Sequence, residues 1–252
     1  MWNDVRMLNI ATGVLAAVFV LILAGGAVAW GMHQRMFDLR GIVVRGDIRH
    51  LSLPAIRASA VAQLRGNFFS IDLGDARRAF ETVPWVRRAT VSRRWPNQLV
   101  VEIEEHVPMA HWIDGRGVNT HGELFAVNTA ELEEYANLPM LEGPAGTEEL
   151  VAQRLHDFTA WFKPIGRVPE AVALSNRFAW SVTLDDGLSV EIGREQDANT
   201  LAQRIARFVS TFDQVKKRWG GELQTADLRY PNGYAVRVAG VKFVAPKTAR
   251  NR

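Results

Sequence analysis

The chain has 252 residues, of which 48% are hydrophobic and 23% are charged, and its formal net charge is only +3. This composition is ordinary for globular structure and is enough for one or two folded domains. There is no cysteine, which excludes disulfides, thiol catalysis and cysteine-based metal sites.

The first predicted element is a transmembrane helix over residues 8–30, LNIATGVLAAVFVLILAGGAVAW, which contain no charged side chain. At about 1.5 Å per residue, such a helix is roughly as long as a hydrocarbon core is thick. Trp2 and Trp30 lie where interfacial aromatic residues are expected. Residues 1–7 are then a short leader and residues 31–40 a connector.

Two alternatives to a membrane anchor stay open. Ala27-Val28-Ala29 fits the small-residue pattern of a signal-peptide cleavage site, although the apolar run is longer than usual for one. A buried core helix would normally show a polar face, and this stretch shows none. Orientation is also open, because long domains translocate largely regardless of their charge.

Residues 41–107 predict a first unit with the order strand, helix, helix, strand, strand. An apolar run precedes the turn at Gly46-Asp47, and two alternating runs flank the turn at Trp95-Pro96-Asn97. Two short helices on one face of a three-stranded sheet make a compact α+β module. Helices that start after Ser52 and Asp72 are predicted from apolar residues at helical spacing: Ile56, Ala60 and Leu64, then Leu73, Ala76, Phe80 and Val83.

Residues 108–240 predict a second unit, a mixed and mainly antiparallel β-sheet with covering helices. Residues 112–125 indicate a hairpin or paired short strands, and the proline- and glycine-rich stretch 138–146 leads to Thr147 as a helix cap. Alternating runs on either side of Asp185-Asp186-Gly187 predict a hairpin. Helical stripes are formed by Val151, Leu155, Phe158, Phe162 and Ile165, and by Leu201, Ile205, Phe208, Phe212, Val215 and Trp219.

The last predicted strand follows the turn at residues 230–233 and alternates Tyr234, Val236 and Val238 with smaller or polar residues. Because no later element is available to cover it, it is expected at an open sheet edge, which either needs protection or pairs with another chain. Residues 241–252 are expected to be a basic, disordered tail.

The first unit resembles a POTRA domain, and more narrowly the POTRA domain of the FtsQ family of bacterial cell-division proteins. The features that carry this resemblance are the phrase Phe69-Ser70-Ile71-Asp72, the run PWVRRATVSRRWPNQLVVEIEE, and Glu105, Pro108, Ala110 and Trp112 after it. In the second unit the matching motif is Asp227-Leu228-Arg229-Tyr230, followed by Gly233 and Val236 and preceded by Gly193-Arg194 and the helix around Arg204.

This resemblance implies a single-pass, type II inner-membrane protein of the division septum with both units in the periplasm. It also implies a scaffold whose second unit binds FtsB and FtsL, with a segment of FtsB extending the sheet at its last strand. The partner-binding residues expected on these grounds are Arg177, Arg229, Tyr230, Asn232, Gly233, Tyr234, Val236 and Val238. Other membrane proteins of the division machinery are further candidate partners.

The sequence was also compared with two other functional classes, a polypeptide-transport component and an enzyme. POTRA modules also serve in polypeptide transport, but the long series of membrane strands that a barrel needs is not present after the first unit. An enzyme is disfavoured, because none of the common nucleophile, phosphate-binding or zinc motifs occurs. His106, His111 and His121 have no metal-ligand spacing, and Glu102 and Glu104 fall on a polar strand face. No cofactor, metal, nucleic acid or small-molecule substrate is expected.

Overall fold

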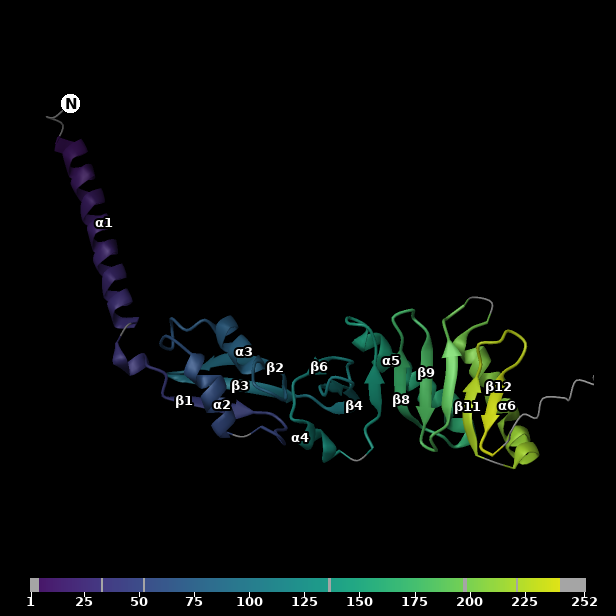
Figure 1. The fold of residues 1–252 in the computed structure, drawn as a ribbon. Helices are drawn as coiled ribbons and strands as arrows, with labels where there is room; N and C mark the ends of the chain where they lie inside the picture. Colours follow the sequence, from purple (N-terminus) through teal and green to yellow (C-terminus); the bar gives the residue numbers. More distant parts are fainter. Residues whose placement is uncertain are drawn as a thin grey trace, which may run out of the picture. The chain divides into compact units, whose positions relative to one another are not determined.

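The computed structural model describes residues 5–32, 34–51, 53–135, 137–196, 199–220 and 222–240 (Figure 1). The chain divides into two compact units after Glu105. Ser52, most of the predicted leader and the predicted basic tail at 241–252 lie outside the described residues.

The chain begins with the long apolar helix α1, Val5–Met32. Residues Asn9–Met32 have a mean hydropathy of 2.4, and none of their most apolar window is buried against the rest of the protein. By length and composition this helix can cross a membrane, and it is the only such helix in the described part of the chain.

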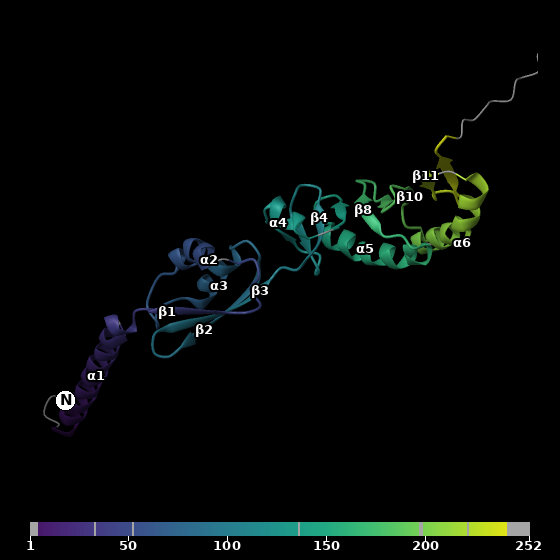
Figure 2. The ribbon, with the colours of Figure 1, turned by 90° about the horizontal axis from the view of Figure 1, so that it is seen from below.

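The rest of the first unit is a three-stranded sheet with two helices on one of its faces (Figure 2). The strands lie in the order β1-β3-β2, with β1 parallel to β3 and β2 antiparallel to it. This arrangement confirms the predicted α+β module. Its elements are β1 Gly41–Arg45, α2 Leu53–Ser59, α3 Leu73–Glu81, β2 Val86–Arg94 and β3 Gln98–Glu105.

The helix starts and ends of this unit follow the sequence signals in part. Asp72 caps α3 as predicted, because its carboxylate accepts hydrogen bonds from the N–H groups of Gly74 and Asp75 at 2.7 and 2.9 Å. The first helix is shorter than its stripe predicted, since α2 ends at Ser59 and a 3-10 turn, Val61–Gln63, replaces its last turn.

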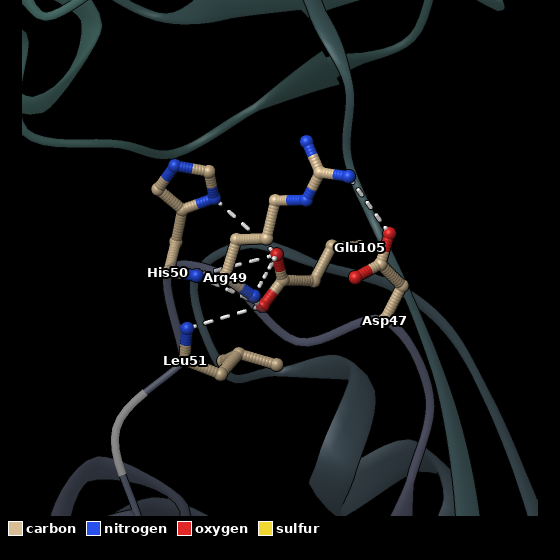
Figure 3. A network of polar contacts seen from close by, with 5 residues as sticks. All are labelled: Asp47, Arg49, His50, Leu51 and Glu105. Carbon is tan, nitrogen blue, oxygen red and sulfur yellow. Dashed lines mark hydrogen bonds and ion pairs between the residues drawn. The ribbon is translucent and has the colours of Figure 1, made fainter.

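A carboxylate holds the loop after β1 to the end of β3 (Figure 3). Glu105, whose side chain is only 7% exposed, accepts hydrogen bonds from three successive backbone N–H groups: those of Arg49 at 3.0 Å, His50 at 3.2 Å and Leu51 at 3.1 Å. The His50 ring approaches the same carboxylate at 3.3 Å and stacks on Trp85. The Glu105 carboxylate therefore accepts hydrogen bonds from loop N–H groups that the pairing of the strands does not satisfy.

The second unit is built on one open sheet of nine strands in the order β12-β11-β10-β9-β8-β7-β4-β5-β6. Five of the eight neighbouring pairs are antiparallel and three are parallel, which confirms a mixed, mainly antiparallel sheet. The strands are β4 Pro108–Trp112, β5 Gly117–Asn119, β6 Leu124–Phe125, β7 Met140–Glu142, β8 Pro169–Leu174, β9 Trp180–Leu184, β10 Ser189–Gly193, β11 Leu223–Asp227 and β12 Ala235–Val238.

Two long helices, α5 Glu148–Phe162 and α6 Leu201–Trp219, cover one face of this sheet (Figure 2). A short helix, α4 Thr129–Glu133, lies between β6 and β7. The apolar stripe of α6 is buried at its first four positions, as expected, whereas Trp219 at the end of the stripe is 50% exposed.

One local prediction for this unit needs correction, and two of its strands are not predicted by the sequence pattern. The proline- and glycine-rich stretch 138–146 contains β7, Met140–Glu142, which lies between β4 and β8. β8 is the second strand without a sequence prediction. Thr147 stands at the start of α5 without capping it, because its hydroxyl donates a hydrogen bond to the carbonyl of Pro144 instead.

The carboxylate of Glu105 gives a first testable prediction. Glu105→Ala should lower the free energy of unfolding of the first unit by about 2 kcal/mol, because three backbone donors, two of them half-buried, lose a charged acceptor. Amide hydrogen exchange at residues 49–51 of the full chain in detergent should accelerate. Glu104→Ala is the matched control, since Glu104 is half exposed and pairs with Arg87 on the strand surface. Equal exchange at residues 49–51 in the two variants would contradict this role.

Candidate protein-binding surface

The terminal strand β12 lies at the edge of the nine-stranded sheet, as the sequence predicted. It pairs antiparallel with β11 through Ala235–Asp227, Val236–Ala226 and Arg237–Thr225. In the described part of the chain no strand pairs with its other side. A row of main-chain groups is therefore available at this edge.

The hydrogen bond that follows β12 shows which of its main-chain groups face outward. The N–H of Ala239 donates to the carbonyl of Glu222 at 2.9 Å, so Ala239 faces β11. Main-chain groups alternate sides along a strand. Arg237 and Ala235 therefore face β11 as well, and the N–H and C=O groups of Val236 and Val238 point away from the sheet.

The side chains at positions 234, 236 and 238 point into the unit, whereas Ala235 and Arg237 are exposed. The Tyr234 hydroxyl is hydrogen-bonded to that of Thr211 on α6, and its ring packs edge-on against Phe208 at a centroid distance of 5.3 Å. Val236 packs against the core and Val238 is buried. Of the expected binding residues, these three can offer a partner mainly their backbone.

The other expected residues gather at one end of the sheet. Gly193 ends β10 opposite Trp180, the first residue of β9, and Glu191 is in register with Asp227 near the end of β11. The turn that carries Arg177 and the loop from Arg229 to Tyr234 therefore share this end, the upper one in Figure 1.

The side chains at this end differ in exposure. Tyr230 is 54% exposed, and Arg177, Arg229 and Asn232 are exposed too, whereas Gly233 is half-buried. Neighbouring strands of a sheet lie about 4.8 Å apart. Because only β10 separates β9 from β11, the ends of these two strands are about 10 Å apart.

Arg229 is held in a fixed orientation by Asp227. Its Nε and Nη2 donate to the two carboxylate oxygens at 2.8 and 2.7 Å, and its backbone N–H donates to one of them at 3.1 Å. This fork lowers the pKa of Asp227, chiefly through the side-chain hydrogen bond from Arg229, and raises the pKa of Arg229. The outer edge of the guanidinium remains open to an acidic partner.

Beneath Arg229 lies a glycine whose conformation leaves room for it. Gly193 has φ +86°, and a Cβ there would meet Cγ of Arg229 at 2.9 Å. Gly193 stands at a β-bulge, because the register of β10 against β9 shifts between Glu191 and Gly193. The aliphatic part of Arg229 can therefore pack directly on the backbone of β10.

A buried guanidinium supports this bulge from the helix side. Arg204 on α6 is only 3% exposed. Its Nη1 donates to the carbonyls of Ile192 and Arg194 at 2.7 and 2.9 Å, and Nη2 donates to the side chain of Gln196 at 2.9 Å. Its Nε has no hydrogen-bond partner in the described part of the protein. Burial lowers the pKa of Arg204.

Asp227, Gly193 and Arg204 belong to the motif that carries the family resemblance, but the sequence does not predict their contacts. One signal was present for Arg204, because it stands three residues after Leu201 and four before Phe208, on the apolar face of the helix. A charged side chain on such a face needs internal partners. Nothing local in the sequence indicates which carbonyls it reaches.

No group of three His, Asp or Glu side chains in the described ranges could hold a metal ion. His106 and His121, considered earlier as ligands, flank Asn119, which accepts a hydrogen bond from the backbone of His121 and contacts the ring of His106 at 2.9 Å. The His106 ring also stacks on Phe125.

Comparisons with known proteins match both units. Residues 37–106 match the POTRA domain, FtsQ-type, and residues 110–229 match the C-terminal region of cell division protein FtsQ/DivIB. Full-length relatives named cell division protein FtsQ include one from Burkholderia pseudomallei, 47% identical over 97% of each chain. The relative from Bordetella pertussis is 41% identical over 95% of this chain and 93% of its own.

The role of Arg204 can be tested by substitution on α6. Arg204→Met should destabilise the second unit by about 2–3 kcal/mol, because the buried carbonyl of Ile192 and the half-buried contact at Arg194 lose a charged donor. Denaturant unfolding of the full chain in detergent, followed by hydrogen exchange at residues 192–196, measures this loss. Arg218→Met removes an exposed arginine from the same helix and should have little effect. The same exchange rates in both variants would mean that Arg204 does not hold the bulge.

The fork between Asp227 and Arg229 predicts a pH dependence. A carboxyl group whose pKa is lowered by folding stabilises the protein above its unfolded pKa of about 3.9, and loses this contribution as the pH falls through the folded pKa. The contribution is small, because Arg229 is exposed to water. An NMR titration of Asp227 should give a pKa below the usual value, which rises on Arg229→Gln and stays low on Arg237→Gln.

Proposed function

The chain belongs to the FtsQ/DivIB family of bacterial cell-division proteins, and we propose that it is a single-pass inner-membrane scaffold that holds other membrane proteins of the division machinery. Matches to both units and to relatives over nearly the whole chain show the family. A role in cell division follows from that membership. The partners, the orientation in the membrane and the binding mode are the proposed parts.

The observation that carries the binding mode is the edge position of β12. The outward main-chain groups of Val236 and Val238 can pair with an extended segment of a partner, which would become the tenth strand of the sheet. Because the side chains of Tyr234 and Val236 pack against α6 and the core, the edge keeps its shape when the partner is absent. Main-chain pairing sets the register of the partner and supplies part of the affinity.

Selectivity comes from the side chains at the end of the sheet. Tyr230 offers an exposed aromatic ring, and Arg229, oriented by Asp227, offers an open guanidinium. Aromatic and arginine side chains commonly dominate the binding energy of an interface. Arg177, Asn232 and Gly233 lie in loops at the same end and complete the surface. An acidic or amide-bearing segment next to the added strand fits it best.

We propose that the partners are FtsB and FtsL and that the edge of β12 receives a segment of FtsB. The support for this identification is family membership together with the edge geometry. The N-terminus is proposed to be cytoplasmic and both units periplasmic, at the septum. Anchoring by α1 confines the search for partners in the same bilayer to two dimensions, which raises their effective concentration.

The strand-addition proposal is tested with the backbone of Val236. Val236→Pro removes an outward N–H without removing a bond to β11, so the fold should persist, and affinity for the soluble parts of FtsB and FtsL should fall about tenfold or more. Val236→Ala is the matched control, since it shortens the side chain and keeps the N–H. Equal affinity of a folded Val236→Pro variant and the Val236→Ala control would refute strand addition.

The aromatic contact is tested separately. Tyr230→Ala should weaken the same binding by about 30-fold, the loss typical of an aromatic anchor. Trp219→Ala, which removes a similarly exposed ring at the far end of α6, should leave the affinity unchanged. Calorimetric titration of the full chain in detergent measures both. If the two variants bind equally well, Tyr230 is not an anchor.

A further inference from the structure

The rings of Phe37, Phe69 and Trp95 form a surface at one end of the first unit. Together with Met36, the chain neighbour of Phe37, we call this surface the aromatic base. The Phe37 ring packs edge-on against Phe69 at a centroid distance of 4.9 Å and lies 6.0 Å from the Trp95 ring. Buried Phe68 lies beneath and contacts both Phe69 and Trp95, at 5.2 and 5.8 Å. The rings therefore form one packed cluster rather than separate exposed residues.

This cluster is nevertheless largely open to solvent. Trp95 is 67% exposed and Met36 is 63% exposed, and Phe69 is exposed as well. An exposed group of large apolar side chains on an otherwise polar domain commonly marks a contact surface. The other end of the same sheet is polar, since Asp47 and Arg49 lie there beside Glu105.

The chain connects the aromatic base directly to the membrane helix. Phe37 follows Met32, the last residue of α1, by only five residues, so at most about 18 Å of extended chain separates them. The connector is also bonded into the base. The N–H of Phe68 donates to the carbonyl of Phe37 at 2.9 Å, and Nδ2 of Asn67 donates to the carbonyl of Met32 at 2.8 Å.

The rest of the cluster is held at the same end by the strand pairing. Trp95 lies in the turn between β2 and β3, and Gln98 at the start of β3 is in register with Gly41 at the start of β1. The N–H of Arg40 donates to the carbonyl of Asn97 at 3.0 Å. The end of the sheet that carries Trp95 is therefore the end at which the chain arrives from α1.

The composition of this surface fits the boundary between headgroups and acyl chains. Tryptophan is enriched there because its ring is apolar and its N–H can still reach polar groups. Exposed Arg40, Arg93 and Arg94 lie at this end, and Asp38 and Asp72 offset only part of their charge. The rings are therefore accompanied by positive charge, as suits a surface that meets lipid headgroups.

We propose that the aromatic base inserts into the interfacial region of the bilayer that α1 crosses. The first unit then has a second membrane contact besides the helix, and this contact limits how far the unit moves from the membrane and how it rotates. The occupant is lipid, because the tether keeps the surface within reach of the bilayer in every copy of the chain. This inference does not depend on the identity of any protein partner.

A single spin label can test this contact, because the chain has no cysteine. Asn97→Cys places a nitroxide beside Trp95, and Asp47→Cys places one at the polar end of the same sheet. The full chain is reconstituted alone into phosphatidylcholine nanodiscs, and collision of each label with oxygen and with a water-soluble nickel chelate is measured. The label at position 97 should favour oxygen and be shielded from nickel, whereas the label at position 47 should show the accessibility of water.

Side-chain substitutions in the Asn97→Cys background show whether the rings cause this contact. Trp95→Ser, alone and with Phe69→Ser, should abolish the preference for oxygen while circular dichroism stays unchanged. Phe178→Ser is the matched control, because this similarly exposed ring belongs to the second unit. If labels 97 and 47 have equal accessibility, or if shielding at 97 survives in a folded double variant, the proposal is wrong. Shielding that arises only after a partner protein is added would also overturn it.

Discussion

Backbone N–H and C=O groups have to be hydrogen-bonded or reach water, and an open sheet cannot meet this requirement within itself at its two edges. One edge of the second unit is β6, whose two residues are too few to pair with another chain. The other edge is β12, which is longer and is held from one face by α6 through Tyr234 and Thr211. Because the side chains of Val236 and Val238 pack inside the unit, β12 presents to another molecule its main chain together with the exposed residues Ala235 and Arg237. The proposed strand addition uses this property.

The same requirement explains two charged side chains that lie where strands end. Glu105 accepts from successive N–H groups in the loop after β1, and Arg204 donates to carbonyls at the end of β10. A carboxylate only accepts and a guanidinium only donates, so each charge meets the kind of group that it can satisfy. Each side chain thereby gives a loop one preferred shape. In the second unit that shape includes Gly193, the backbone surface on which Arg229 packs.

Membrane attachment acts on the two proposed contact surfaces in different ways. In the proposed function, α1 keeps the whole chain in the plane where anchored partners would diffuse, which would favour binding at the proposed edge through effective concentration. The aromatic base, if inserted, acts on the first unit alone, since its rings all belong to the connector, the loop before α3 and the turn between β2 and β3. A cluster held by short-range packing and by the Phe68–Phe37 backbone bond is already ordered before it meets lipid. Little conformational entropy is then lost on contact.

The sequence by itself determined the elements whose signals are local: the apolar length of α1, the cap at Asp72, the hairpin around Gly187 and the stripe of α6. It also determined the family, because the POTRA and second-unit motifs are specific together. It missed β7, because the three residues Met140–Glu142 become a strand only by pairing in parallel with β4 and β8. It also missed β8, and it misassigned Thr147, whose hydroxyl bonds to the carbonyl of Pro144 instead of capping α5. Only the tertiary structure decided that Arg204 reaches the end of β10, that Arg229 lies over Gly193, and that Phe37, Phe69 and Trp95 meet. These contacts join residues far apart in the chain, and no local pattern encodes which distant backbone group or ring a side chain will meet.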